Sequence, residues 1–290
     1  MSLARVVDLT MILRRLQSIG YTEEAANSIY GGYSTLAVSM FNLPASMVTP
    51  IALAVVPMLA SSINCGDIAK ERKTLNSAFK LCGLMIIPAS FGLSAFSRPI
   101  LELVFGDETG AVNIAAPLLS VLAVAVLFSC LMTVSNAVLQ AYGKERKPIV
   151  SMLFGAAVKL ILAYFLIGNP QINIYGAPLS TLACDITVTA INFAYIRKTT
   201  PCMEKPTDLF GRSLISAIIA VGGCAVAYYT TLTLGVLTPS RIVTVCVILV
   251  SGVIYLAVAL KLGAIDYDDI ALLPRGKEAY GIMKRIRLVK

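Results

Sequence analysis

Two charged residues lie in the middle of long apolar segments, and this placement constrains the fold more than any other feature of the sequence. Segments 153–168 and 175–195 each have about the length of a bilayer-spanning helix, and a short turn joins them. Lys159 and Asp185 lie about halfway along their respective segments. A single charge at the bilayer centre costs roughly 2.5–3.5 kcal/mol on insertion scales. Since antiparallel neighbours would bring the two charges to similar depth, we predict an ion pair inside the bundle, facing a water-filled cavity or closed to it.

The composition places the whole chain in the class of integral membrane proteins. Hydrophobic residues make up 57% of the 290 residues, charged residues make up 14%, and the mean hydropathy is +0.81. One water-soluble core of this size cannot bury so many apolar side chains. The segments are rich in Leu, Ala, Ile and Met and do not alternate as strands do, so helices are favoured over a β-barrel. The predicted fold class is all-α, a polytopic helical membrane protein.

About eight transmembrane helices are predicted. Pro44, Pro50 and Pro57 fall within the second of them, which predicts kinks or local unwinding. The polar stretch 199–212 is the best linker candidate, and it divides the chain into a six-helix lobe at 1–198, a two-helix hairpin at 199–262 and a basic tail at 263–290. The predicted spans cover residues 6–19, 33–62, 75–96, 114–141, 153–168, 175–195, 213–234 and 241–260.

Basic residues gather at alternate ends of these spans. Of the 24 Lys and Arg residues, 18 lie in segments 70–80, 144–147, 197–212 and 261–290. The positive-inside rule assigns these ends, and with them the C-terminus, to the cytoplasmic side of the cell membrane. The net charge of +8 is then explained by topology and by attraction to anionic lipids, and it calls for no nucleic-acid partner.

The residues that are absent narrow the possible chemistry. The chain has no histidine, which excludes His-dependent catalytic triads, and its seven cysteines show no CxxC spacing. A membrane glycosyltransferase would need an acidic metal-binding motif. The acidic cluster Asp266, Asp268 and Asp269 is better explained as the start of a solvated helix. We therefore expect no enzyme activity, no cofactor and no bound metal.

Three further charges, Asp8, Arg14 and Arg15, lie in the first span. Counted from Gly20 at about 1.5 Å per residue, the arginines lie roughly 7–9 Å below the outer end of the span and Asp8 roughly 18 Å below it. The arginines either snorkel to outer headgroups or line a cavity and bind an anionic group, since guanidinium forks suit phosphate. Both explanations stay open.

Uncharged polar residues inside the spans extend the candidate set. Asn42, Asn136, Gln140 and Asn192 add amide groups to the spans. Asn42 is a candidate cavity residue, and interhelical hydrogen bonds are expected to explain most such residues. Tyrosines near segment ends, Tyr30 and Tyr33 among them, are predicted interfacial anchors, because the chain has no tryptophan. A purely structural Lys159–Asp185 pair and a pair that separates or takes up a proton during transport both remain possible.

A series of short strings then gives the sequence a family resemblance. The strings are Asp8 with MILRRL at 11–16, Tyr30-Gly31 with Tyr33, Asn42-Leu43-Pro44, Val56-Pro57, VLQAYGK at 138–144 with Pro148, Lys159, and INIYGA at 172–177. In this order they resemble the polysaccharide biosynthesis and stage V sporulation protein B group, which belongs to the superfamily of MATE exporters, O-antigen flippases and MurJ-type lipid II flippases. The resemblance covers nearly the whole chain.

The resemblance implies a transporter built from two lobes. Members of the group have about fourteen helices, as two six-helix lobes around a central cavity plus two extra helices, and they work by alternating access. This chain looks like helices seven to fourteen, so an N-terminal lobe is an expected partner. MurJ-type proteins place a cavity arginine shortly before the proline of the second span here. In this chain Ser39 lies in that region, and Arg14 and Arg15 are candidates to replace the arginine.

The implied function is that of a flippase that moves a lipid-linked oligosaccharide, or another cell-wall or polysaccharide precursor, across the cytoplasmic membrane. Two alternatives stay open, a MATE-like cation-coupled exporter that uses Asp185 or Asp8, and a non-transporting scaffold in envelope or spore assembly. The candidate cavity residues are Arg14, Arg15, Asp8 and Asn42, and the candidate intramembrane pair is Lys159 and Asp185.

Overall fold

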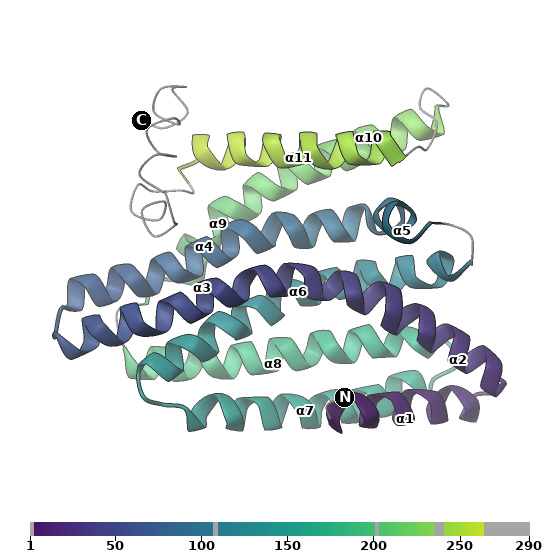
Figure 1. Ribbon diagram of the computed structural model, residues 1–290, viewed down its shortest axis with the longest axis horizontal. Helices are drawn as coiled ribbons and strands as arrows, with labels where there is room; N and C mark the ends of the chain where they lie inside the picture. Colours follow the sequence, from purple (N-terminus) through teal and green to yellow (C-terminus); the bar gives the residue numbers. More distant parts are fainter. Residues whose placement is uncertain (1–2, 107–109, 201–202, 235–240, 264–290) are drawn as a thin grey trace.

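The chain folds as a layered bundle of long helices. The computed structural model describes residues 3–106, 110–200, 203–234 and 241–263, and within them the regular backbone is helical, without strands. Figure 1 shows the helices lying side by side with short connections at both ends. Seven of the described helices are long and apolar enough to cross a membrane. The predicted all-α polytopic membrane fold is therefore confirmed.

The first predicted span, residues 6–19, is a helix that falls short of a usual spanning length. Helix α1 (Leu3–Ser18) has 16 residues, which is just below the roughly 17 that a spanning helix needs. It ends at a turn in which Gly20 adopts a positive φ of 101°, a conformation that glycine adopts without strain. The described residues thus hold seven candidate spans rather than eight, with α1 as a shorter helix beside them.

The second span is longer and more regular than the prolines predicted. Helix α2 (Glu23–Gly32), the π-helical turn η1 (Tyr33–Ala37) and α3 (Val38–Asn64) run on as one helix of 42 residues. All three prolines lie inside α-helical α3, and the irregular hydrogen bonding falls at η1 instead. Of the two predicted outcomes, local unwinding at the prolines is therefore wrong, and a kink stays a prediction.

Helix α6 is the centre of the bundle, and it packs against α3, α4 and α8. Helix α7 lies at the edge, where it contacts mainly α8 and α1. This leaves most of its surface available to lipid (Figure 1). The helices of this part are α4 (Ile68–Ala95), α5 (Ser97–Phe105), α6 (Ala111–Ala141), α7 (Arg146–Ile167), the 3-10 turn η2 (Asn173–Tyr175) and α8 (Gly176–Thr199).

The last helices form a hairpin on the α4 side of the bundle (Figure 1). It consists of α9 (Pro206–Ala217), the π-helical turn η3 (Ile218–Gly222), α10 (Gly223–Thr233) and α11 (Arg241–Lys261). The linker predicted at 199–212 is mostly helical, because α8 continues to Thr199 and α9 begins at Pro206, a favourable first helical residue. The predicted division of the chain into units stays a prediction. The tail 264–290, with the acidic cluster, lies outside the described residues.

The basic connections gather at one end of the bundle, on the left of Figure 1. There the Lys144 ammonium donates a hydrogen bond to Thr199 Oγ1 at 2.8 Å, and Arg212 donates to the Gly263 carbonyl at 2.6 Å. Arg72 and Lys80 both lie 4.0 Å from the Glu204 carboxylate. The alternation of basic and non-basic ends seen in the sequence therefore corresponds to two opposite ends of the molecule.

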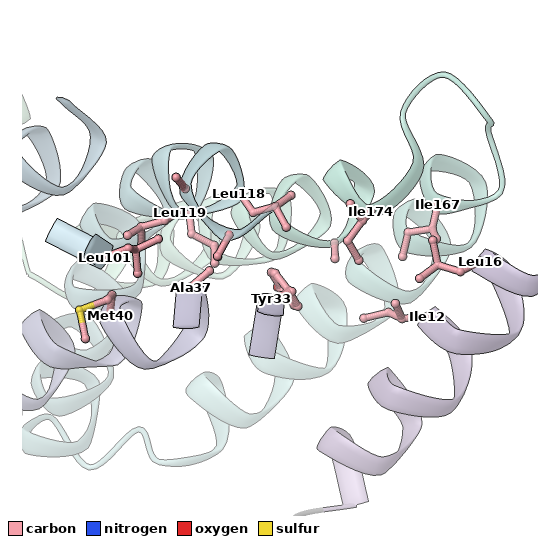
Figure 2. Close-up of a cluster of buried hydrophobic side chains, with 14 of the residues drawn as sticks. Ile12, Leu16, Tyr33, Ala37, Met40, Leu101, Leu118, Leu119, Ile167 and Ile174 are labelled. Atoms are coloured by element: carbon pink, nitrogen blue, oxygen red, sulfur yellow. The ribbon is translucent and has the colours of Figure 1, made fainter. Parts of the chain in front are cut away.

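A cluster of buried apolar side chains joins α1 to the rest of the bundle. Figure 2 shows Ile12 and Leu16 of α1 with Ile167 of α7, Ile174 of η2 and Tyr33 of η1 in this cluster. Ile12 and Leu16 are one helical turn apart, so both side chains lie on the same face of α1. This packing fixes α1 beside α7 and thereby sets the position of Asp8, one turn before Ile12.

Candidate functional site

A polar cavity lies between α1, η1, α3, α7 and α8. Its volume is about 600 Å³, within the usual range for small-ligand sites. Apolar residues such as Leu122 and Ala163 form part of its wall. The polar side chains that line it are Asp8, Tyr30, Tyr33, Ser34, Ser39, Asn42, Lys159, Ser180 and Thr181.

The only ion pair on the cavity wall, among the described residues, joins Lys159 to Asp8. The Lys159 ammonium donates a hydrogen bond to Asp8 Oδ2 and so links α7 to α1. The side chains are 27% and 25% exposed, so both charges are partly withdrawn from water. Pairing and access to the cavity together explain why two charges are tolerated at this depth.

The predicted Lys159–Asp185 ion pair is not formed. Contacts between Gly155 of α7 and Cys184 of α8 place Lys159 and Asp185 at similar depth, as the sequence suggested. The Lys159 side chain, however, points toward the cavity and α1, whereas Asp185 does not line the cavity. Segment lengths predict depth, but the rotation of each helix about its axis decides which residue becomes the partner.

Asp185 lies buried beside α6 and α7. Its side chain is only 6% exposed, and Oδ2 has no hydrogen-bond partner among the described residues. Lys159 is near enough to interact with it electrostatically, and so are the thiols of Cys130 and Cys184. The chain therefore holds two carboxylates and one ammonium within one small region of the bundle.

Neither candidate arginine lines the cavity. Arg15 donates from Nε to the Tyr164 carbonyl at 3.1 Å, and its guanidinium carbon lies 3.5 Å from the centre of the Tyr164 ring. Its Nη2 also lies close to Gly168, at the end of α7. A cation is favourable at a helix C-terminus, where carbonyl groups lack helical partners. Arg14 is exposed on the same end of α1.

Several cavity residues were missed at the sequence level. Tyr30 and Tyr33 line the cavity, and their predicted role as interfacial anchors stays a prediction. The π-helical turn that begins at Tyr33 changes the helical phase at the cavity wall, a placement that is frequent at functional sites. The spacing of Tyr30, Ser34 and Asn42 along one helix face was the signal that could have found them.

A second polar group of residues lies inside the α6–α8 contact. Asn192 donates from Nδ2 to Ser135 Oγ at 3.0 Å and to Asn136 Oδ1 at 2.7 Å. Thr189 donates to the Phe128 carbonyl at 3.0 Å. The interhelical hydrogen bonds expected for most of the amides in the spans are thus formed by Asn136 and Asn192, whereas Gln140 is exposed. We call Asn192, Ser135 and Asn136 the amide cluster.

Two further hollows separate the hairpin from the rest of the bundle, and both have mainly apolar walls. One, of about 290 Å³, lies between α4, α6, α8 and α9 and includes Phe193 and Phe210. The other, of about 390 Å³, lies between α3, α4, α5, η3 and α11 and includes Pro44 and Pro88. Surfaces of this kind suit hydrocarbon chains better than polar groups.

The site offers binding groups rather than reactive ones. Hydroxyl and amide groups surround one ion pair, and within the described ranges no group of His, Cys, Asp and Glu side chains could hold a metal ion. The fold and the cavity together define a class, the polytopic α-helical membrane proteins with a polar cavity among their helices.

Within this class the chain belongs to the lipid II flippase MurJ family, whose model matches residues 25–263. That range includes most of the cavity wall and the hairpin, but not Asp8, Arg14 or Arg15.

Three curated relatives from Bacillus subtilis (strain 168) are similar to the chain. The uncharacterized membrane protein YabM is 24% identical over 279 residues, which is 94% of this chain and 50% of YabM. The lipid II flippase MurJ is 31% identical over 157 residues, 54% of this chain and 28% of that protein. Stage V sporulation protein B is 25% identical over 213 residues, 73% of this chain and 40% of that protein. The chain thus spans half or less of the length of these relatives.

Proposed function

We propose that this chain provides the cavity of a flippase that moves a lipid-linked oligosaccharide or a related cell-envelope precursor across the cytoplasmic membrane. The observation that carries the proposal is the 600 Å³ polar cavity between membrane helices in a chain of the MurJ family. A flippase needs a polar path for a headgroup and an apolar environment for its lipid tail. It needs no covalent step, so the proposed function is transport and not catalysis.

The polar headgroup would occupy the cavity. Lys159 supplies the cation, and Tyr30, Ser34, Asn42 and Thr181 supply hydroxyl and amide groups of the kind that bind sugars and phosphates. The ion pair with Asp8 holds Lys159 in place before the substrate arrives. A phosphate group can then replace the Asp8 carboxylate as the partner of the ammonium, because both are anionic acceptors.

The lipid tail would stay in the membrane, along the apolar hollows beside the hairpin. The walls of the first hollow come from α9 of the hairpin and from α4, α6 and α8. The walls of the second come from η3 and α11 of the hairpin and from α3, α4 and α5. We further propose that segment 1–198 acts as the transporter lobe and that a second lobe covers the exposed side of α3, where Leu43, Met47 and Leu53 lie at the surface.

The orientation completes the proposal. The basic end of the bundle would face the cytoplasm and its anionic lipids, and the ends that carry Glu23 and Glu102 would face outward. Arg14, exposed near the outer end, is then suited to anionic headgroups there. A membrane potential of 100 mV contributes about 2.3 kcal/mol per unit charge moved, which is enough to bias a transport cycle.

The test is a flipping assay on the full-length protein in lipid vesicles, with a fluorescent lipid-linked oligosaccharide whose outward appearance is measured. Lys159→Met should lower the initial rate at least about tenfold, the effect of losing roughly 1.4 kcal/mol of interaction. Lys80→Met, the same change at a lysine outside the cavity, should keep the rate within about twofold. Absence of flipping by the unmodified protein, or equal rates for Lys159→Met and Lys80→Met, would contradict the proposal.

A further inference from the structure

The molecule holds one ammonium near two carboxylates, and only one of the carboxylates is paired with it. Lys159 of α7 binds Asp8 of α1 on the cavity side. Asp185 of α8 lies at similar depth and near enough to Lys159 to interact with it electrostatically, without an ion-pair partner among the described residues. The described structure therefore neutralises the charge of Asp8 but not that of Asp185.

The surroundings of Asp185 do not favour an ionised carboxylate. Asp185 is only 6% exposed, and its Oδ2 receives no hydrogen bond from the described residues. The titratable groups near it are Lys159 on α7, Cys130 on α6 and Cys184 on α8. Asp8 of α1 is the ion-pair partner of Lys159. Tyr175 of η2 lies at the start of α8, far from Asp185 along the helix. Neutral thiols cannot offset the cost of a buried anion, so a proton on Asp185 is the remaining way to neutralise it.

We infer that Asp185 is a proton-binding site that exchanges with Lys159. While Lys159 is paired with Asp8, the Asp185 carboxyl group carries a proton. When the Asp185 O–H bond breaks, the proton passes to water, and the carboxylate that remains takes the Lys159 ammonium as its partner. Asp8 is then left ionised on the cavity wall, where water can solvate it.

The positions of Lys159 and Asp185 on adjacent helices favour this exchange. Lys159 and Asp185 lie at about the same level of the α7–α8 contact, which is held close by Gly155. The lysine side chain is flexible, so its ammonium can turn from one carboxylate toward the other. Loss of the Asp8 contact removes the only ion pair between α1 and α7 among the described residues, so proton release would loosen α1 at the cavity.

This inference rests on the proposed function where it gives the exchange a purpose. In a flippase the exchange would couple proton movement to the opening of the cavity and would free Lys159 from Asp8 at a defined step. The proton site itself is a property of the folded chain, so it can be tested without any transport measurement.

The test is infrared spectroscopy of the full-length protein in lipid nanodiscs at neutral pH, with the aspartate carboxyl carbon labelled by ¹³C. A protonated aspartate gives a carbonyl stretching band that shifts on labelling. The band should be present in the unmodified protein and absent from Asp185→Asn. Asp208→Asn, which removes an exposed carboxylate on α9, should leave it unchanged. Absence of a label-sensitive band from the unmodified protein would overturn the inference without any substitution.

The exchange has its own test in the same experiment. Asp8→Asn frees the Lys159 ammonium to pair with Asp185, so the band should be lost at neutral pH. Lys159→Met removes the ammonium, so the band should persist and should extend to higher pH than in the unmodified protein. A band that is unchanged in Asp8→Asn would overturn the exchange. A failure of the flipping assay beside a positive infrared result would overturn the proposed function and leave the proton site standing.

Discussion

The polar cavity and the amide cluster are two ways of placing polar side chains in the same membrane bundle. The cavity holds charges, Lys159 and Asp8, which are about a quarter exposed. The amide cluster holds no formal charge, and Asn192 and Ser135 are fully buried between α6 and α8. Charge is thus found where water can reach it, and uncharged hydrogen bonds are found where helices exclude water.

Asp185 departs from this division, because it is ionisable but is as buried as the neutral Thr189 on the same helix. It lies on α8 between the cavity side, which carries Thr181, and the amide cluster side, which carries Asn192. We infer from this comparison that the cavity is the part that rearranges during transport, and that the α6–α8 contact stays fixed. The following substitutions are ordered by expected effect, and each strengthens or breaks that comparison.

The largest effect is expected from charge changes at the cavity pair. Asp8→Lys places a second ammonium beside Lys159, and the like-charge repulsion should lower the flipping rate by more than about tenfold. The double variant Asp8→Lys with Lys159→Asp restores opposite charges across the α1–α7 contact and should recover a substantial part of the rate. The measurement is the initial rate of flipping in vesicles.

The double variant also decides between two explanations. Recovery of the flipping rate would show that residues 8 and 159 act through their mutual attraction. Equal losses in the single and double variants would show that each residue acts on the substrate by itself. Both variants should keep their melting temperatures within a few degrees, since the cavity gives water access to the altered charges.

The sequence predicted the depth of these groups but not their partners. The lengths of the apolar segments predicted that Lys159 and Asp185 lie at the same level of adjacent helices, and the contact between Gly155 and Cys184 agrees with that part of the prediction. The choice of Asp8 as the partner depends on how α1 packs through Ile12 and Leu16, a long-range contact that no local pattern encodes. The polar face from Tyr30 to Asn42 was readable by helical period but was interrupted by the π-helical turn.

A smaller effect, on stability, is expected from closing the space at Gly155. A Cβ at this position would press on Val188 Cγ2 and lie 3.1 Å from Cys184 Sγ, so Gly155→Val should lower the stability by about 1–3 kcal/mol. Ala156→Val introduces the same side chain on the exposed side of α7 and should change stability by less than about 0.5 kcal/mol. Thermal unfolding in nanodiscs measures both. Equal stability of the two variants would show that α7 and α8 are free to separate.

A still smaller effect is expected in the amide cluster. Asn192→Leu leaves Ser135 and Asn136 without their shared donor, and interhelical hydrogen bonds in membranes contribute on average about 0.6 kcal/mol, up to about 1.7. Stability should fall by that amount while flipping stays within about twofold of the unmodified rate. Gln140→Leu, at an exposed amide of α6, is the matched control. A loss of flipping at full stability would place the cluster in the transport cycle and break the comparison.

The smallest effect is expected at Arg15, whose charge stabilises the contact between α1 and α7 and does not line the cavity. Arg15→Gln removes the cation from the end of α7 and the stacking on Tyr164, and should lower stability by about 0.3–1 kcal/mol. Arg14→Gln, at its exposed neighbour, should leave the melting temperature unchanged, and Arg15→Lys should restore only part of the loss because an ammonium cannot stack as a guanidinium does. None of the three should alter the flipping rate, since neither arginine lines the cavity. A flipping defect in Arg15→Gln at unchanged stability would return this arginine to the substrate path and would extend the charged region of the transporter from the cavity to the outer end of α7.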